Sequence, residues 1–208
     1  MDFLRIKGEK VALSPIMTDY NSVSFYRKWM CDPEINKWIG HNGTVPSFEA
    51  EEKWAKDTSD SFKFSILSLI SPIGLEAKEP LLIGTAAIHK QPDPLTFSLG
   101  VCIGEVSYHN KGLGTEVMQL LLSHCFNELH AHRVILSLNR ANVKAFKCYK
   151  KAGFKVCGVA HDARWVNGAY CDVIHMEILD RDYFSKYGEP AKATPVQLTE
   201  EDLDYLKI

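Results

Sequence analysis

The stretch YHNKGLGTEVMQLLL, residues 108–122, places two glycines directly before an apolar pattern of helical period. Glycine adopts backbone conformations closed to other residues and lets a ligand approach the main chain closely. The N-terminus of a helix offers unpaired amide groups and a partial positive charge. With Lys111 adding a full positive charge, Gly112 and Gly114 predict an anion site best suited to phosphate.

Three interpretations of this loop compete. A P-loop requires a Lys-Ser/Thr pair after its last glycine, but Thr115 and Glu116 follow Gly114. A dinucleotide-binding fingerprint requires a third glycine or alanine where this chain has Val117, so a nucleotide-binding oxidoreductase has little support. The remaining alternative is a plain tight turn before a helix, and the loop alone does not exclude it.

Composition limits the class of protein. The chain has 208 residues, of which 46% are apolar, which predicts a globular protein with one substantial core. A formal net charge of -2 gives no electrostatic case for a nucleic-acid partner. No apolar run has the length of a membrane span, and the N-terminus lacks a signal-peptide core, so no membrane partner is expected. The six cysteines form no CxxC pair; we expect reduced thiols, no metal site and a cytoplasmic location.

The apolar periodicity predicts an α+β fold, a three-layer α/β/α sandwich on one mixed, mostly antiparallel central sheet. A helix capped by Asp19 or Asn21 is expected to break or kink at Asp32-Pro33, and Ser47 is expected to cap a second helix. A helix from Thr115 and another over residues 142–152 follow. Strands are expected at residues 10–17, 62–70, 81–89, 96–103, 133–139, 154–159 and 170–179, with a polar turn at residues 71–80.

The predicted domain covers residues 1–185. Residues 186–208 form a tail of different composition, with a possible short helix at residues 199–203.

The glycine loop is accompanied by a second motif. Residues 108–115, YHNKGLGT, resemble the pyrophosphate loop of the GCN5-related N-acetyltransferases, the GNAT superfamily. Residues 139–154, NRANVKAFKCYKKAGF, resemble the second cofactor motif of that family. Residues 8–15, GEKVALSP, and 165–173, WVNGAYCDV, are similar to the branch that contains ribosomal-protein N-terminal and spermidine acetyltransferases. The resemblance extends over about residues 8–185.

The resemblance implies that acetyl-CoA is the cosubstrate and that it lies where the sheet is splayed between the fourth and fifth strands, residues 96–103 and 133–139. A splayed strand leaves peptide groups free to bind the pantetheine arm like a short added strand. The expected contacts in this region of the cofactor site and in the pyrophosphate loop come from Ile103, Gly104, His109, Asn110, Lys111, Gly112, Leu113, Gly114 and Thr115.

The second motif supplies one face of a helix. Asn142, Ala145, Phe146 and Tyr149 have the spacing i, i+3, i+4 and i+7 and therefore share that face. The resemblance implies that the first three contact the cofactor and that Tyr149 protonates the departing thiolate as general acid. Lys147, with Lys144 and Lys151, is expected to bind the ribose phosphate. Ordinary core packing and solvated lysines are the competing interpretations.

The acceptor and the general base stay open. Ser137 and Asn139 are not strong bases, so a water chain, His89 or Glu105 is considered instead. An acidic and aromatic mouth (Trp29, Trp38, Trp54, Trp165, Tyr170, Glu49, Glu51, Glu52, Asp162 and Asp172) would suit a cationic amine, namely a peptide N-terminus, a polyamine or an aminoglycoside. The predicted function is acetyl transfer to a primary amine by direct attack, in a monomer or homodimer. The alternative is a non-catalytic acyl-CoA-binding or sensing module.

Overall fold

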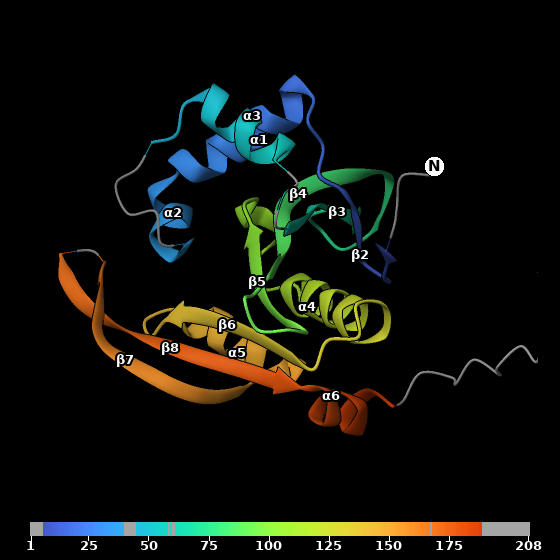
Figure 1. Cartoon of the computed structure of the whole chain (residues 1–208). Coiled ribbons are helices and arrows are strands. Elements are labelled where there is room, and N and C mark those ends of the chain that lie inside the picture. Colours follow the sequence, from blue (N-terminus) through green and yellow to red (C-terminus); the bar gives the residue numbers. More distant parts are fainter. Residues whose placement is uncertain (1–5, 40–44, 58, 60, 167, 189–208) are drawn as a thin grey trace, which may run out of the picture.

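The computed structural model describes residues 6–39, 45–57, 59, 61–166 and 168–188 (Figure 1). Its described strands form one sheet in the order β1-β2-β3-β4-β5-β6-β8-β7. All neighbouring strands pair antiparallel except β5 and β6, which run parallel. This confirms the mixed, mostly antiparallel sheet. The strands are β1 (Ile6–Lys7), β2 (Val11–Pro15), β3 (Ser61–Ile70), β4 (Glu76–Lys90), β5 (Thr96–Ile103), β6 (Arg133–Asn139), β7 (Lys155–Val166) and β8 (Ala169–Leu179).

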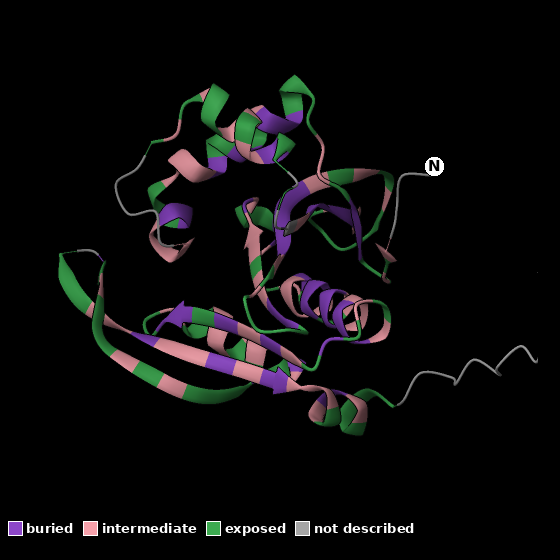
Figure 2. Ribbon diagram, viewed as in Figure 1, coloured by how far each residue is buried: buried purple, intermediate pink, exposed green. Residues whose placement is uncertain are grey.

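Helices cover both faces of this sheet. On one face, α1 (Tyr20–Cys31), α2 (Pro33–Ile39) and α3 (Phe48–Lys56) form an apolar cluster that includes Leu82 and Cys102 of the sheet. On the other face, α4 (Leu113–Ser123), α5 (Val143–Ala152) and α6 (Asp180–Tyr187) pack into the larger cluster. Figure 2 shows the buried residues concentrated on the sheet and on the inner side of α4. The two clusters on opposite faces make the fold a three-layer α/β/α sandwich.

The helix after the glycine loop is amphipathic as its sequence predicts. Val117, Met118, Leu121 and Leu122 are all buried, and together they form the stripe that packs on the sheet. The last turn widens into a π-helix, η2 (His124–Glu128), which keeps Cys125 and Phe126 in the core. A π turn inserts one extra residue per turn, which an apolar period of 3.6 does not reveal.

The helix ends follow their capping residues. Asp19, rather than Asn21, caps α1: its Oδ1 accepts from the Ser22 amide at 3.1 Å and its Oδ2 from the Ser22 hydroxyl at 2.6 Å. The chain breaks at Asp32, so α1 and α2 are separate helices. Ser47 caps α3 by accepting from the Ala50 amide at 3.2 Å. Each cap satisfies an amide that the first helical turn leaves unpaired.

Replacing Asp19 with alanine is expected to lower the free energy of unfolding by about 1 kcal/mol, the usual cost of losing an N-cap. The hydrogen bonds from Ser22 lower the pKa of Asp19. This stabilisation is therefore present above the unfolded pKa and is lost as pH falls through the folded pKa. Urea unfolding at pH 7 and pH 3 measures both effects, with the exposed Asn21→Ala as control. Equal losses at the two pH values would contradict this account.

Two expected boundaries are wrong, and one short strand was not predicted. Residues 71–80 are not a turn throughout: the turn closes with Ser71 N–H donating to Leu75 O at 2.6 Å, and β4 begins at Glu76. That part of β4 is mostly exposed, so it lacks the apolar alternation that marks a strand. The predicted strand at residues 154–159 continues as β7 to Val166, again largely exposed and with a register shift. The two-residue β1 carries too little pattern to be identified.

The proposed division between domain and tail remains a prediction. α6 continues past residue 185 to Tyr187, whose hydroxyl donates to Ala152 O at 3.0 Å. The short helix expected at residues 199–203 lies outside the described residues.

Candidate active site

The glycine loop presents a row of unpaired amides. The N–H groups of residues 110–114 have no hydrogen-bond acceptor among the described residues, whereas those of Thr115 and Glu116 both donate to Gly112 O. Asn110 and Gly112 have positive φ values of 61° and 82°, which turn successive amides toward one side. A Cβ added at Gly112 would meet nothing within 4 Å. The loop therefore presents free amides at the N-terminus of α4, a geometry suited to an anion.

Charged side chains near the loop favour an anion. Glu116, in the first turn of α4, points away: its carboxylate accepts from the amides of Lys10, at 2.8 Å, and Val11, at 3.3 Å. An acid that would repel phosphate is thus engaged by the β1–β2 turn. Lys111 has no ion-pair partner among the described residues. The loop consequently keeps its positive potential.

The sheet opens beside this loop. β5 and β6 pair only where Thr96, Phe97 and Ser98 lie opposite Arg133, Val134 and Ile135. Beyond these pairs the two strands diverge, and we call this region the β5–β6 fork. It lies where the sequence predicted the splay between the fourth and fifth strands. β6 remains paired to β8 through Asn139, so the opening concerns β5 and β6 alone.

Peptide groups of β5 point into the fork. Leu95 O accepts from Arg133 N–H on the β6 side, and Gly104 N–H donates to Ile83 O on the β4 side, at 2.9 Å. Because peptide groups alternate in direction along a strand, those of Val101 and Ile103 point toward β6. The peptide groups of Val101 and the N–H of Ile103 are available to a ligand that lies along β5 as an added strand.

Two of the expected contact residues have other partners. The N–H of Gly104 is used within the sheet, and a Cβ at this position would lie 2.1 Å from the Trp29 ring. The packing of Trp29 therefore explains this glycine. The His109 ring is not simply exposed, because its Nε2 lies 2.7 Å from Ile103 O. His109 thereby ties the start of the loop to the end of β5.

α5 lines the fork from the side of α4. Asn142 is the N-cap of α5, not a residue of its first turn, and its Oδ1 accepts from Ala145 N–H at 3.1 Å. Its Nδ2 has no acceptor among the described residues and can still donate to a ligand carbonyl. Ala145, Phe146 and Tyr149 are partly buried against the larger cluster. A Cβ on Gly114 would lie 3.7 Å from Cys148 Sγ of α5 and 3.6 Å from Ile103 Cδ1, so loop, strand and helix converge here.

Tyr149 of α5 lies against the fork. It is partly buried against the larger cluster, and its pKa responds to Cys102 of β5, whose side chain packs with the helices of the opposite face. Burial, with smaller effects from Cys148 and Cys102, raises the pKa of the Tyr149 hydroxyl above its usual value. The hydroxyl therefore keeps its proton at neutral pH and can act as a proton donor.

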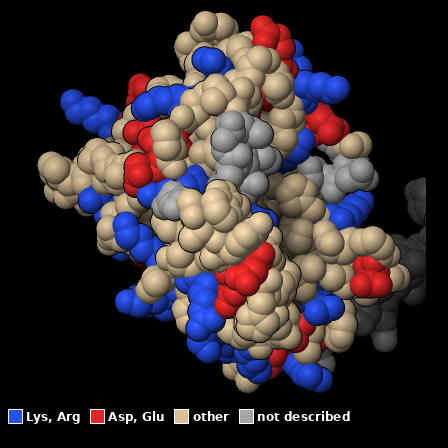
Figure 3. Space-filling view, turned by 90° about the vertical axis from the view of Figure 1, so that its left-hand side faces the viewer, with Lys and Arg blue, Asp and Glu red and all other residues tan. Residues whose placement is uncertain are grey.

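The lysines of α5 remain exposed. Lys144 and Lys147 have no ion-pair partner in the part of the chain that the structure describes. On the face of the molecule in Figure 3, the lower half, at the height of α5 and the β7–β8 hairpin, carries more basic than acidic side chains. Their proposed contact with the ribose phosphate remains a prediction.

Neither of the bases considered from the sequence is well placed. His89 pairs with Ser98, four residues before Cys102 on β5, which is roughly 13 Å at 3.3 Å per residue. Glu105 accepts from Lys28 Nζ and Trp29 Nε1, both at 3.0 Å. Burial alone would raise the pKa of Glu105, but these partners lower it overall. A carboxylate held in this way is a weak base.

The expected acidic and aromatic mouth does not form as a unit. Trp29 is 1% exposed and belongs to the core, whereas Trp165 and Tyr170 are exposed near the tip of the β7–β8 hairpin, with ring centroids 4.9 Å apart. Glu52 pairs with Lys56 at 2.7 Å. Glu51 is the exception, since it is partly buried and its carboxylate has no hydrogen-bond or ion-pair partner among the described residues. The sequence alone groups Glu51 with Glu49 and Glu52. Only the orientation of α3 in the structure separates Glu51 from these two acids.

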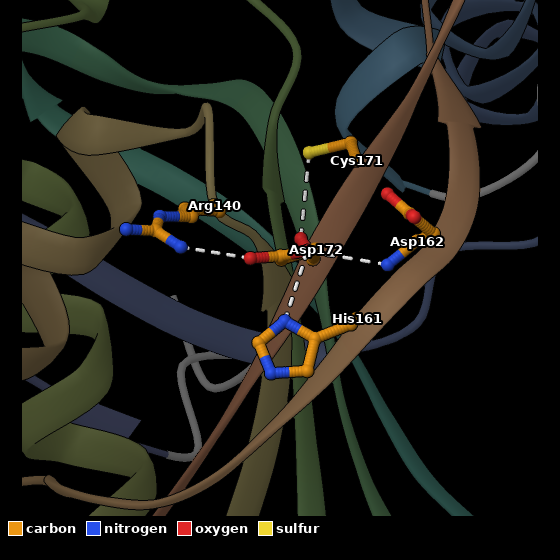
Figure 4. Close-up of polar contacts among 5 residues, drawn as sticks. All are labelled: Arg140, His161, Asp162, Cys171 and Asp172. Carbon is orange, nitrogen blue, oxygen red and sulfur yellow. Dashed lines mark hydrogen bonds and ion pairs between the residues drawn. The ribbon is translucent and has the colours of Figure 1, made fainter.

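Asp172 organises the hairpin rather than a mouth. Its Oδ2 accepts from Arg140 Nη1 at 2.8 Å, and its Oδ1 accepts from the Asp162 amide at 3.2 Å (Figure 4). His161 Nδ1 lies 3.5 Å from the same carboxylate. These contacts hold the irregular segment of β7 against β8 and link it to the residue that follows β6.

Among the described residues, no three His, Cys, Asp or Glu side chains come together as a candidate metal site. No described helix has the length and apolar character to cross a membrane.

Comparison with known proteins assigns the fold to a family. The acetyltransferase (GNAT) domain matches residues 10–155, and the chain belongs to this family. The N-acetyltransferase 9-like protein of Caenorhabditis briggsae is 28% identical over 159 residues, covering 73% of this chain and 78% of that protein. Spermidine N(1)-acetyltransferase of Escherichia coli K12 is 31% identical over 85 residues, 41% of this chain. That match spans 46% of the E. coli protein, slightly less than half its length.

Solved structures share the architecture. Spermidine N-acetyltransferase from Vibrio cholerae, in complex with CoA and spermine, superposes with a TM-score of 0.72 at 19% identity. The superposition covers 85% of this chain and 99% of that one. A GNAT-family acetyltransferase from Bacillus anthracis gives a TM-score of 0.69 at 20% identity, covering 85% and 98%. At this identity the likeness establishes the fold alone.

Proposed function

We propose that this protein is an N-acetyltransferase that transfers an acetyl group from acetyl-CoA to a primary amine by direct attack. The observation that carries the proposal is the convergence of three features at the β5–β6 fork. These are the unpaired amides of residues 110–114, the ligand-facing peptide groups of β5, and the hydroxyl of Tyr149. A simple anion-binding site would need only the unpaired amides.

The residues present fit the cosubstrate. The amides of residues 110–114 and Lys111 would hold a pyrophosphate, and Val101 and Ile103 would bind the amides of a pantetheine arm. Asn142 Nδ2 and Phe146 would fix that arm from the side of α5. Acetyl-CoA, when bound, supplies an acetyl group activated as a thioester.

The residues of this chain then position the thioester and the amine and donate a proton to the leaving group. A ligand fixed along β5 places its reactive end near Cys102 and Tyr149, so an amine entering from the side of α1–α3 meets it in a fixed orientation. Tyr149 donates its proton to the departing sulfur. The core packing around the fork limits the access of water.

The proposed acceptor is a cationic primary amine. The similar proteins include the spermidine acetyltransferase above and an aminoglycoside N(6')-acetyltransferase of Klebsiella pneumoniae, which is 24% identical over 152 residues. Peptide N-termini are the competing acceptor class.

An acceptor screen tests the function. Purified protein is incubated with acetyl-CoA and spermidine, spermine, kanamycin, a lysine-containing peptide or an N-terminal Ala peptide, and released CoA is separated by chromatography. Chromatography is preferable to thiol reagents because Cys157 is exposed and would react. We expect amine-dependent CoA release. CoA binding by calorimetry without turnover of any amine would instead support the acyl-CoA-sensing alternative.

A further inference from the structure

Glu51 lies on the inner face of α3. Phe48, Trp54 and Ala55 belong to or pack against the cluster between α1–α3 and the sheet, and Glu51 has the spacing that places it on the same face. The neighbouring acids differ from it. Glu49 is exposed in the first turn, and Glu52 is paired with Lys56. Of these three acids, Glu51 is therefore the one that α3 places toward the cluster between α1–α3 and the sheet.

The inner face of α3 packs in the same apolar cluster as Cys102 of β5, at the fork. Burial raises the pKa of the Cys102 thiol to about 12, and the Glu51 carboxylate adds to that rise. Cys102 in turn acts on Tyr149, which approaches from the opposite face. Cys102 of the fork thus packs on the side of α1–α3, where Glu51 lies, whereas Tyr149 packs on the side of α5.

The carboxylate has no cation to neutralise it among the described residues. Burial raises the pKa of Glu51, and no positive group in the described part of the chain offsets this effect. Other titratable groups that touch α3 are engaged elsewhere. Tyr26 shares a hydrogen bond of 2.7 Å with Ser65, and Lys63 Nζ donates to the carbonyls of Trp54 and Asp57. A partly buried carboxylate without a partner is costly, and a bound cation would remove that cost.

A second acceptor atom faces the same side. Asn139, at the end of β6, is 1% exposed; its Nδ2 donates to Lys37 O of α2 at 3.2 Å, but its buried Oδ1 has no partner. A buried acceptor without a donor is uncommon and calls for a ligand or water. β6 thus carries the free amide oxygen of Asn139. The free carboxylate of Glu51 lies on the helix that packs beside Cys102 of β5. Both atoms accept hydrogen bonds, as an ammonium group requires.

We propose that Glu51 binds the protonated amine of the acceptor and removes its proton before attack, with Asn139 Oδ1 accepting a further N–H. This inference rests on the proposed acetyl transfer. The ammonium nitrogen gives one proton to the Glu51 carboxylate, and its freed electron pair forms a bond to the thioester carbonyl carbon. The C–S bond breaks, the sulfur takes the proton of Tyr149, and the second proton leaves the new amide nitrogen to restore Tyr149. Glu51 releases its proton to solvent.

Glu51→Gln keeps size and hydrogen bonding while removing the base, and Glu49→Gln is the matched control on the exposed side of α3. With spermidine and with an N-terminal Ala peptide, we expect Glu51→Gln to lower kcat/KM at least about 100-fold at pH 7, the usual contribution of a general base. The deficit should narrow as pH rises toward the amine pKa, about 10 for an alkylamine such as spermidine and about 8 for a peptide α-amino group, because more amine is then already neutral. The Kd for CoA should be unchanged, which also reports that the variant is folded.

Three outcomes decide the proposal. A Glu51→Gln deficit that narrows with pH, beside a Glu49→Gln enzyme with wild-type rates, supports it. Wild-type kcat/KM in Glu51→Gln, or a deficit that is constant from pH 6.5 to 9.5, overturns the role of Glu51 and leaves the acetyltransferase intact. Wild-type protein that binds CoA but turns over none of the amines overturns the proposed function and this inference with it.

Discussion

Replacing Gly112 with valine is expected to raise the Kd for CoA at least about 30-fold, or about 2 kcal/mol. Gly112 has a φ of 82°, a conformation that a β-branched residue adopts only with strain. The strain is relieved if the loop changes shape, and the amides of residues 110–114 then no longer converge on one point. A hydrogen bond from an amide to a charged phosphate is worth about 1.5–3 kcal/mol, so the loss of one or two accounts for the effect.

The fold should survive this change, because a Cβ at Gly112 meets nothing within 4 Å. Gly158 of β7 is the matched control: it also has open space around an added Cβ, and its φ is not positive. Isothermal titration with CoA should show Gly158→Val binding like wild type. Undiminished CoA binding by a folded Gly112→Val protein would remove the loop from the cofactor site.

Replacing Tyr149 with phenylalanine is expected to lower kcat by about 100- to 1,000-fold, because a positioned proton donor contributes on that order. The ring packs near Phe154, with ring centroids 6.1 Å apart, and phenylalanine preserves this contact. The Kd for CoA should therefore stay within about twofold of wild type, since packing of the same volume is retained. The raised pKa of Tyr149 means that wild-type activity should not fall at mildly alkaline pH through loss of this proton.

Single-turnover measurement of CoA release, with calorimetric CoA binding in parallel, separates chemistry from affinity. Tyr183→Phe is a suitable control, because Tyr183 lies in α6 and packs on Phe126, away from the fork. An unchanged kcat in Tyr149→Phe would exclude the hydroxyl from the mechanism. Equal losses of kcat and CoA affinity would make it a packing residue.

Much of the fold was predictable because its elements carry strong periodicity. β5 and β6 begin and end where the alternating pattern predicts, and Val134, Leu136 and Leu138 share the buried face. Caps were equally informative: Ser47 starts α3, and Gly153, with a φ of 109°, ends α5. The prediction failed where both strand faces are exposed, as in the first half of β4 and the second half of β7.

The site was predicted less completely than the fold. The glycine loop and the α5 face depend on residues close together in sequence, so their geometry follows from local rules. The remaining features depend on contacts between distant segments. Gly104 makes room for the Trp29 ring of α1, and Glu51 shares the inner face of α3 while Glu52 pairs with Lys56. No periodicity encodes these contacts, because each is set by how α1 and α3 pack on the sheet.

A crystal structure of the protein with CoA tests the central claim most directly. The account predicts pyrophosphate oxygens within hydrogen-bonding distance of the amides of residues 110–114 and a pantetheine arm along β5 in the β5–β6 fork. It also predicts that the CoA sulfur lies within reach of the Tyr149 hydroxyl. CoA bound elsewhere, or a fork in which Leu99 to Ile103 pair with the rest of β6, would contradict it.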